Sequence, residues 1–340
     1  MRNLQRTSIT DRLQRTTYLL KNSLTVVGRD RDIITPWIRS TIYGCVEVTP
    51  FYLGVGFIMY GIAAQSGGLI GWGVGALALW LGLFLYKSFF YNHQEMRQSW
   101  LVAETAAGRD RSYADAKERA QQVESQIRAI AALDMLAAWI ANRQANKDED
   151  SGLGAFVVNL FIAGLTEVWD LLNHFLIPAV AIDGVTIKDG ISNVRRLKDQ
   201  VPETLTGVFG IDFLARVVGV IVAPVYFVLT LVALSLSIAM ADMLPAFSLP
   251  MPSGVEVPAA LLTDGALKLT VIPLFALIFV GKLFSVVLER AVISVKIIYF
   301  TIFYVQITHP DRIASDLQPE LEAYLKMESL PQSGAAVETA

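Results

Sequence analysis

Hydrophobic residues dominate a run of 51 residues, 217–267, that holds no lysine or arginine. The first half of this run, as far as Ala241, carries no charge at all. About 20 apolar residues of α-helix cross a bilayer core, whereas a surface helix of a soluble domain needs a polar face. The pattern therefore predicts an all-α integral membrane protein, a polytopic bundle of about six spans with amphipathic helices on the cytoplasmic side.

Two further apolar segments predict a transmembrane hairpin over residues 34–92. Its first span runs from about 34 to 64 and is polar at its start, and its second runs from about 68 to 91. The link between them, 65–67, carries no charge, which is typical of a short loop on the extracytoplasmic side.

Residues 1–33 predict an amphipathic cytoplasmic helix, because apolar residues such as Ile9, Leu13 and Leu20 recur at helical spacing. Cations that would contact lipid headgroups occupy its other faces: Arg12, Arg15 and Lys21. Packing of this helix against the protein's own cytoplasmic face is the alternative.

Residues 93–150 are predicted to form a cytoplasmic helical region. One helix is expected to end at Gly108, and Ser112 with Asp115 resembles a capping box that starts another. Within this second helix, the weakly apolar segment 125–142 is a possible third span.

The next apolar segment, 151–185, carries a polar stripe, and 186–205 predicts a basic interfacial helix. The cations of that helix are expected to contact anionic lipid headgroups: Lys188, Arg195, Arg196 and Lys198. If 151–185 crosses the membrane once, 125–142 must cross as well, which gives six spans. If 125–142 stays in the cytoplasm, the polar-striped segment is a re-entrant hairpin and four full spans result.

Residues 206–306 predict the last two membrane helices, joined by a Pro-rich extracytoplasmic loop at 242–267. The last apolar pattern starts near Lys268 and is nearly twice as long as a membrane core requires. The final helix is therefore expected either to project into the cytoplasm or to break near Glu289. The tail, 307–340, is polar and predicted to be partly disordered.

Composition and charge agree with a membrane location. Hydrophobic residues make up 54% of the chain and charged residues 17%, against about 25% charged residues in soluble domains. The first 33 residues hold seven Lys/Arg, so the positive-inside rule predicts a cytoplasmic N-terminus. We therefore expect a multi-pass protein of the bacterial cytoplasmic (inner) membrane. The single cysteine, Cys45, excludes an internal disulfide.

Three stretches of the sequence carry a family resemblance: Leu20-Lys-Asn-Ser23 with Asp30-Arg-Asp32 and Pro36, the stretch from Phe175 through Pro178 and Asp183 to Ser192, and Ile302-Phe-Tyr304 before Pro310. Together they resemble an uncharacterised bacterial and archaeal family of polytopic membrane proteins, classed as a domain of unknown function. The resemblance covers about residues 8–310, implies a six-helix membrane bundle and supplies no catalytic residues to carry over. The chain departs from the family at Leu24, where an aromatic is common, and at 125–142, which is less apolar than the family's third span.

Glu167, Asp170 and His174 fall at i, i+3 and i+7 and therefore on one helical face. Ionisable groups inside a membrane are costly and indicate functional sites by default. Oxygen and imidazole ligands on one stripe are able to bind a divalent cation or relay protons, but three ligands from one helix cannot close a coordination sphere. A polar stripe that faces other helices or a partner subunit is the alternative interpretation.

Two other charged features lie in predicted spans. Asp212 and Arg216 have the i, i+4 spacing of an ion pair, which would lower the cost of inserting both charges. Lys282, in the last span, is expected to snorkel toward the headgroups or to pair with a carboxylate such as Asp170.

Gly67, Gly71 and Gly75 form a repeated Gly-x-x-x-Gly at the start of the second span. Small residues four apart allow close helix contact in lipid, within one chain or between chains. No nucleotide-binding loop, Cys-x-x-Cys pair or His-Glu-x-x-His element occurs in the sequence, so we predict neither a cofactor nor a metal site.

These patterns favour a structural or accessory membrane subunit that docks partners in the bilayer, with no catalytic chemistry evident. The expected partners are anionic lipids and other membrane subunits or further copies of the chain, and not nucleic acid. The alternative is a transporter or channel lined by Glu167, Asp170 and His174. A membrane-embedded hydrolase or metalloenzyme is the least favoured class.

Overall fold

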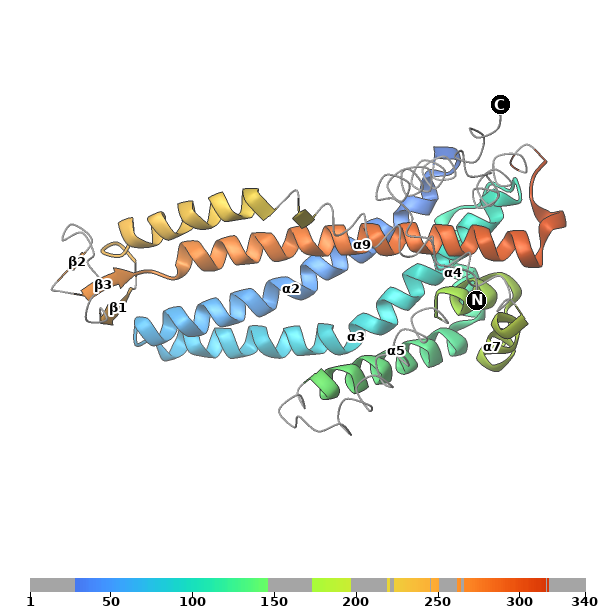
Figure 1. The fold of residues 1–340 in the computed structure, drawn as a ribbon. Helices are drawn as coiled ribbons and strands as arrows, with labels where there is room; N and C mark the ends of the chain where they lie inside the picture. The colour runs from blue at the N-terminus through green and yellow to red at the C-terminus, as the bar shows by residue number, and fades with distance from the viewer. Residues whose placement is uncertain are drawn as a thin grey trace, which may run out of the picture. The chain divides into compact units, whose positions relative to one another are not determined.

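The computed structural model describes residues 28–145, 173–196, 219–220, 223–244, 246–250, 262–263, 266–315 and 317. These residues are mainly helical (Figure 1). The labelled helical elements are η1 (Arg31–Ile33), α2 (Ile34–Ala63), α3 (Gly67–Ala106), α4 (Tyr113–Gln122), α5 (Glu124–Ala145), α7 (Ile187–Arg196), α9 (Ile272–Thr308) and η4 (Pro310–Arg312). Two further helical segments span 173–183 and Ala223–Ala239.

Three of the described helices are long and apolar enough to cross a membrane: α2 with the 3₁₀ turn before it, α3, and α9. The prediction of a helical protein with membrane-length apolar helices is therefore confirmed. The count of six spans is not confirmed by the described residues, and α5 is not among these three helices. Helix Ala223–Ala239 is apolar but shorter.

The chain forms two compact units. The described residues of unit 1 lie within 28–40, 88–196 and 291–317, and those of unit 2 lie within 41–87 and 219–290. Helices α2, α3 and α9 contribute residues to both units, because each continues past the residue at which the units divide.

In unit 2, glycines bring α2 and α3 into close contact. A Cβ atom added at Gly73 would lie 2.6 Å from the Cγ1 atom of Ile58 and 2.7 Å from the backbone oxygen of Gly54. A Cβ added at Gly61 would lie 2.9 Å from the Cγ1 atom of Ile70. The predicted short link is confirmed: α2 ends at Ala63, Gln65 adopts a positive φ of 50°, and α3 follows at once.

The surface of unit 2 is apolar. Its described residues include very few buried aliphatic or aromatic side chains, namely Val48, Ala233, Ala241 and Val286. Large apolar side chains are instead exposed, such as Trp72 at 75% and Val280 at 59%. Water-soluble monomers rarely expose contiguous apolar surface of this kind, so the arrangement suits a hydrocarbon solvent.

A small antiparallel sheet with strand order β1-β3-β2 precedes α9. Its strands are β1 (Phe247–Pro250), β2 (Leu262–Thr263) and β3 (Ala266–Leu269). The sheet lies at the segment 242–267, which was expected to be an extended loop, and the described residues outside it are mainly helical. Lys268 lies in β3, opposite Ser248 of β1, and the last membrane helix starts later, at Ile272.

Unit 1 has a core in which apolar side chains from several helices are buried. One buried cluster joins residues such as Leu101 of α3, Phe175 of helix 173–183, and Phe300 and Tyr304 of α9. A second cluster packs one face of α4 and α5 against helix 173–183, with Ile127, Leu176 and Val180 among its buried members. Part of the segment predicted to be membrane-embedded, 173–182, therefore lies in a protein core.

One predicted helix boundary is wrong and one start is confirmed. Helix α3 continues without a break from Gly67 to Ala106, where two separate helices were expected. Of the two alternatives for the last helix, α9 continues past Glu289 without a break. The capping box is present, because the Ser112 hydroxyl accepts from the Asp115 backbone N–H and the Asp115 carboxylate accepts from that of Ser112.

Helix α3 ends at Ala106, close to the glycine at which the sequence predicts its end. Gly108 adopts a positive φ of 70°, a backbone conformation that favours glycine. The next residue, Arg109, donates from its Nε and Nη2 atoms to the two carboxylate oxygens of Glu104, at 2.6 and 2.7 Å. This hydrogen-bonded pairing raises the pKa of the Arg109 guanidinium above its ordinary value.

Candidate functional site

The three stretches that carry the family resemblance all have described residues in unit 1. The second and third meet directly, because the Phe175 ring packs against Phe300 and Phe303 with centroids 5.0 and 5.9 Å apart. The first is tied to α9 through Gln98 of α3, whose Nε2 donates to the Ile33 carbonyl and to the Ser294 hydroxyl.

Asp183 is the centre of a polar cluster in unit 1. Its Oδ2 accepts a hydrogen bond from the Tyr304 hydroxyl at 2.5 Å, and its Oδ1 lies 2.7 Å from Nε2 of His309. Asp183 is the last residue of helix 173–183, where a negative charge opposes the helix dipole. The two donors compensate for that position and fix the end of α9 to the end of helix 173–183.

Arg119 of α4 binds the same end of helix 173–183 as Tyr304 and His309, and we call this group of contacts the Asp183 corner. It donates from Nε to the carbonyl of Ala181 at 2.9 Å and from Nη2 to that of Ile182 at 3.1 Å. Carbonyls at a helix C-terminus lack intrahelical partners, and Gly184, with a φ of +65°, ends the helix in the left-handed conformation. Three elements therefore converge on the Asp183 corner.

Tyr113 is the centre of a second polar cluster. Its hydroxyl accepts from Arg97 at 2.6 Å and donates to Gln94 at 3.0 Å, and the Arg39 guanidinium lies 4.5 Å from the ring centroid. The Tyr113 backbone N–H donates to Asp32 of η1 at 2.7 Å. These hydrogen bonds hold η1, α3 and α4 together, which is a structural role.

The predicted polar stripe is described at one position. Glu167 and Asp170 lie outside the described residues, so the stripe stays a prediction. His174 is half-buried in unit 1, and its ring centroid lies 4.7 Å from that of Phe300. Transport along this stripe, the alternative function, stays a prediction as well.

Several other predicted site residues also lie outside the described residues: Arg12, Arg15, Lys21, Lys198, Asp212 and Arg216. Within the predicted basic helix, 186–205, the structure describes α7, with Lys188 exposed and Arg195 and Arg196 at its end, and residues 197–205 lie outside the described residues. A Cβ added at Gly190 would lie 2.5 Å from Leu176, so α7 packs closely on helix 173–183.

The predicted glycine repeat has a clear place in unit 2. Gly67, Gly71 and Gly75 are exposed, and a Cβ atom added at any of them would meet nothing within 4 Å. The glycine that packs against α2 is instead Gly73. The repeat therefore does not hold this hairpin together and leaves an open, small-residue face on α3.

Unit 2 also contains a buried carboxyl group. Glu47 of α2 is 7% exposed, and Trp80 of α3 donates from Nε1 to its Oε1 atom at 3.1 Å. The Tyr43 hydroxyl, one turn earlier, donates to the Leu83 carbonyl at 2.7 Å. These polar contacts join α2 and α3 close to residues 41 and 87, where this segment of unit 2 begins and ends along the chain.

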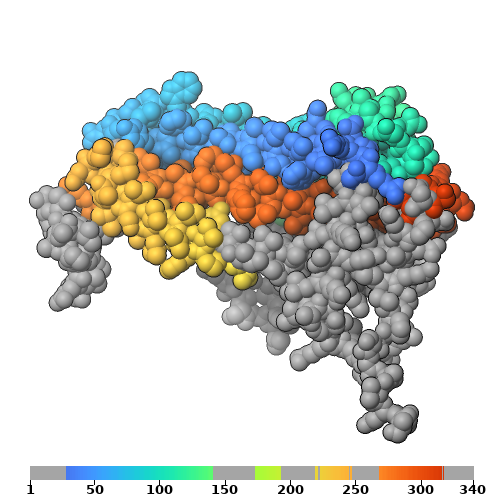
Figure 2. Space-filling view, turned by 90° about the horizontal axis from the view of Figure 1, so that it is seen from above, coloured from blue at the N-terminus to red at the C-terminus, as the bar shows by residue number. Residues whose placement is uncertain are grey.

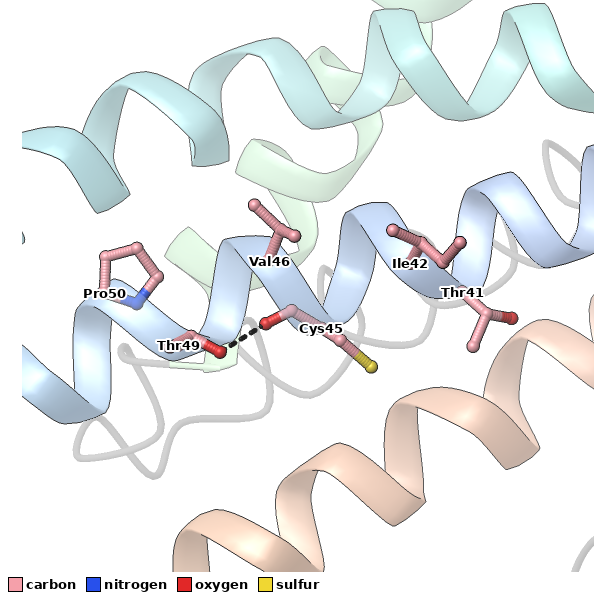
Figure 3. A pocket seen from close by; sticks show the side chains of 6 residues that line it. All are labelled: Thr41, Ile42, Cys45, Val46, Thr49 and Pro50. Atoms are coloured by element: carbon pink, nitrogen blue, oxygen red, sulfur yellow. Dashed lines mark hydrogen bonds between the residues drawn. The ribbon is translucent and has the colours of Figure 1, made fainter.

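A hollow of about 420 Å³ lies along α2 (Figure 3). It is lined by Thr41, Ile42, Cys45, Val46, Thr49 and Pro50. Figure 3 shows the side chains of Ile42, Val46 and Pro50 on one side of the helix and those of Thr41, Cys45 and Thr49 on the other. Thr49 donates to the Cys45 carbonyl at 2.7 Å, so its hydroxyl is used within the helix. Among the residues that the structure describes, no group of three or more His, Cys, Asp or Glu is arranged to hold a metal ion.

The fold and these clusters define a helical protein with three membrane-length apolar helices and a separate compact helical unit. No family model matches the sequence, and comparisons with curated proteins and with solved structures found no match either.

Proposed function

We propose that the chain is a structural or accessory subunit of the cytoplasmic membrane, which docks another membrane subunit on the open glycine face of α3. This face consists of Gly67, Gly71 and Gly75. The observation that carries the proposal is the contrast between two sets of glycines. Gly54, Gly61 and Gly73 are closed by neighbours in the chain, whereas the three glycines of the face have open space around them. Glycines four apart allow the backbone of another helix to approach in lipid.

The division into units supports a membrane location for unit 2. It contains residues 41–63 of α2, 67–87 of α3 and 272–290 of α9, which are stretches of about 20 residues each. Each of these three stretches is by itself long enough to cross a hydrocarbon core. Unit 1, with its own apolar core, is then the part outside the bilayer, and the charge of the N-terminal segment supports a cytoplasmic location for it.

The basic helix α7 supports a second type of contact, with anionic lipid headgroups. Lys188 is exposed on it, and Arg195 and Arg196 extend the basic character to its end. Basic residues on an amphipathic helix are attracted to the negative surface of the cytoplasmic leaflet.

We propose that the chain crosses the membrane four times. Helix α5 belongs to unit 1, where Ile127 and Ile130 are buried against helix 173–183. Six spans would require 125–142 to cross the membrane, and the burial of one face of α5 in a protein core favours the alternative in which it stays in the cytoplasm.

Sided cysteine labelling tests this topology. In a Cys45→Ala background, an impermeant maleimide applied to the periplasmic side is expected to label Ser248→Cys in β1. It should not label Ser125→Cys or Gln144→Cys, at the start and near the end of α5, until the membrane is permeabilised. Labelling of Gln144→Cys from the periplasmic side would restore the six-span count, and labelling of Ser125→Cys from that side would overturn the cytoplasmic location of unit 1.

Docking on the glycine face is tested with Gly71→Leu. We expect this substitution to weaken co-purification of the partner by about tenfold or more, because a bulky side chain blocks the close helix approach that small residues allow. The matched control is Ala276→Leu, which adds the same side chain at an exposed position of α9. Equal recovery of the partner with both variants would contradict docking on this face.

A further inference from the structure

Helix α9 is covered on two sides within unit 2. On one side, Phe275 and Phe279 each lie 5.3 Å from the ring of Tyr52 in α2. On the other, a Cβ added at Gly281 would lie 2.7 Å from the ring of Tyr226 in helix Ala223–Ala239. In Figure 2 part of α9, in orange, remains visible between this helix, in yellow, and α2, in blue. At about 100° per residue, these contacts leave two uncovered ridges on opposite faces of α9.

The two ridges differ in chemistry. The polar ridge consists of exposed residues at spacings of four, three and four: Ile278, Lys282, Ser285 and Glu289. The apolar ridge consists of exposed residues at spacings of four: Ala276, Val280 and Phe284. Hydrocarbon is a poor solvent for polar side chains on any face of a helix. The apolar ridge suits lipid, and the polar ridge needs another explanation.

Lys282 lies near the middle of the membrane part of α9. About 15 Å of helix separates it from Ile272, where α9 begins, and about 12 Å separates it from Arg290, where unit 2 ends. Its side chain leans toward the helix N-terminus, and therefore along the longer of the two distances. In a hydrocarbon core about 30 Å thick, this position is too deep for a snorkelling ammonium to reach a headgroup phosphate.

Lys282 makes no hydrogen bond or ion pair with any residue that the structure describes. Two carboxylates among the described residues of unit 2 are engaged elsewhere, since Glu47 accepts from Trp80 and Glu289 accepts from Arg290 at 2.6 Å. A cation inside a membrane is retained where an opposite charge pairs with it. At mid-membrane depth, the group that can supply such a charge is a carboxylate on another transmembrane helix.

We propose that Lys282 docks an aspartate or glutamate carried at mid-membrane depth by a transmembrane helix of a partner protein. Ser285, one turn along the same ridge, provides a hydroxyl that adds a hydrogen bond to the same helix. This inference rests on the proposed docking function and identifies the chemistry of the partner, at a surface on α9 that is separate from the glycine face of α3.

Photo-crosslinking in intact membranes tests the proposal. We would incorporate p-benzoylphenylalanine at Ser285, on the polar ridge, and at Val280, on the apolar ridge of the same helix, as the matched control. The Ser285 probe is expected to capture a peptide of another membrane protein that carries Asp or Glu within its membrane segment, whereas the Val280 probe captures mainly lipid. Capture of lipid alone, of residues 151–172 of the same chain or of a second copy by the Ser285 probe would overturn the proposal.

The charge of Lys282 is tested by two variants of similar length. Lys282→Met is expected to lower recovery of the crosslinked partner at least tenfold, and Lys282→Arg is expected to retain most of it. Equal recovery with Lys282→Met and the wild type would overturn the ion pair. If Gly71→Leu still releases the partner in that case, the proposed function stands without the Lys282 contact. If the wild-type chain carries no partner, the proposed function itself fails.

Discussion

Replacing Gly73 with leucine is expected to prevent stable folding of the α2–α3 hairpin. Even a single added carbon would lie 2.7 Å from the backbone oxygen of Gly54, an atom that cannot move aside without displacing α2. Overpacking a tight contact typically costs about 1–3 kcal/mol, and a clash with backbone belongs at or above the upper end of that range. The measurement is the thermal unfolding temperature of the detergent-solubilised chain, together with its yield as a monodisperse species.

The matched control for Gly73→Leu is Gly75→Leu. It makes the same change two residues further along α3, at a position with nothing within 4 Å. We expect its unfolding temperature to stay close to that of the wild type. If both variants unfold alike, the assignment of Gly73 to the internal contact and of Gly75 to the open face is wrong.

Replacing Asp183 with alanine is expected to loosen the end of α9 in unit 1. The substitution removes the acceptor for both Tyr304 and His309, and Tyr304 is fully buried. A buried hydroxyl left without a partner costs about 1–3 kcal/mol, so we expect a similar loss in the free energy of unfolding. Hydrogen exchange should rise in residues 300–312 before it rises in the α2–α3 hairpin.

Asp189→Ala serves as the control for Asp183→Ala. Asp189 is an exposed carboxylate on the first turn of α7, where it accepts from the Thr186 hydroxyl at 2.7 Å. Because surface hydrogen bonds contribute little, we expect a change below about 1 kcal/mol. Equal destabilisation by the two substitutions would argue that the Asp183 corner holds no special role in unit 1.

Features set by local chemistry could be predicted from the sequence. The capping box at Ser112, the positive-φ glycine at Gly108 and the short link after Ala63 all depend on residues within one turn of each other. The apolar content of α2, α3 and α9 was sufficient to predict membrane-length helices. Each of these signals can be read without knowing what surrounds the helix.

The remaining features depend on what covers an apolar face, and periodicity is the same whether lipid or protein covers it. Helix 173–183 was predicted to be membrane-embedded, yet Phe175 and Leu176 are buried in the core of unit 1. The second predicted span and the predicted helix that ends at Gly108 were expected to be separate helices. They lie instead within one helix, α3, that passes from unit 2 into unit 1.

In the candidate sites as well, local features could be predicted from the sequence and contacts between distant residues could not. Asp183 and Tyr304 were both part of the stretches that carry the family resemblance, but 121 positions separate them, and no local pattern indicates that they are hydrogen-bonded. The spacing of Gly67, Gly71 and Gly75 indicated one face of the helix, and helix packing on that face stays a prediction. That this face is open, and that Gly73 makes the internal contact, depends on the rotation of α3 against α2.

The most direct test of the proposed docking function is native mass spectrometry of the full-length chain, extracted from its own membrane in mild detergent. We expect a complex in which the 37.3 kDa chain is bound in fixed ratio to another membrane protein, and dissociation of that complex in the Gly71→Leu and Lys282→Met variants. A wild-type chain that emerges as a monomer carrying only lipid would contradict the proposal that it is a docking subunit.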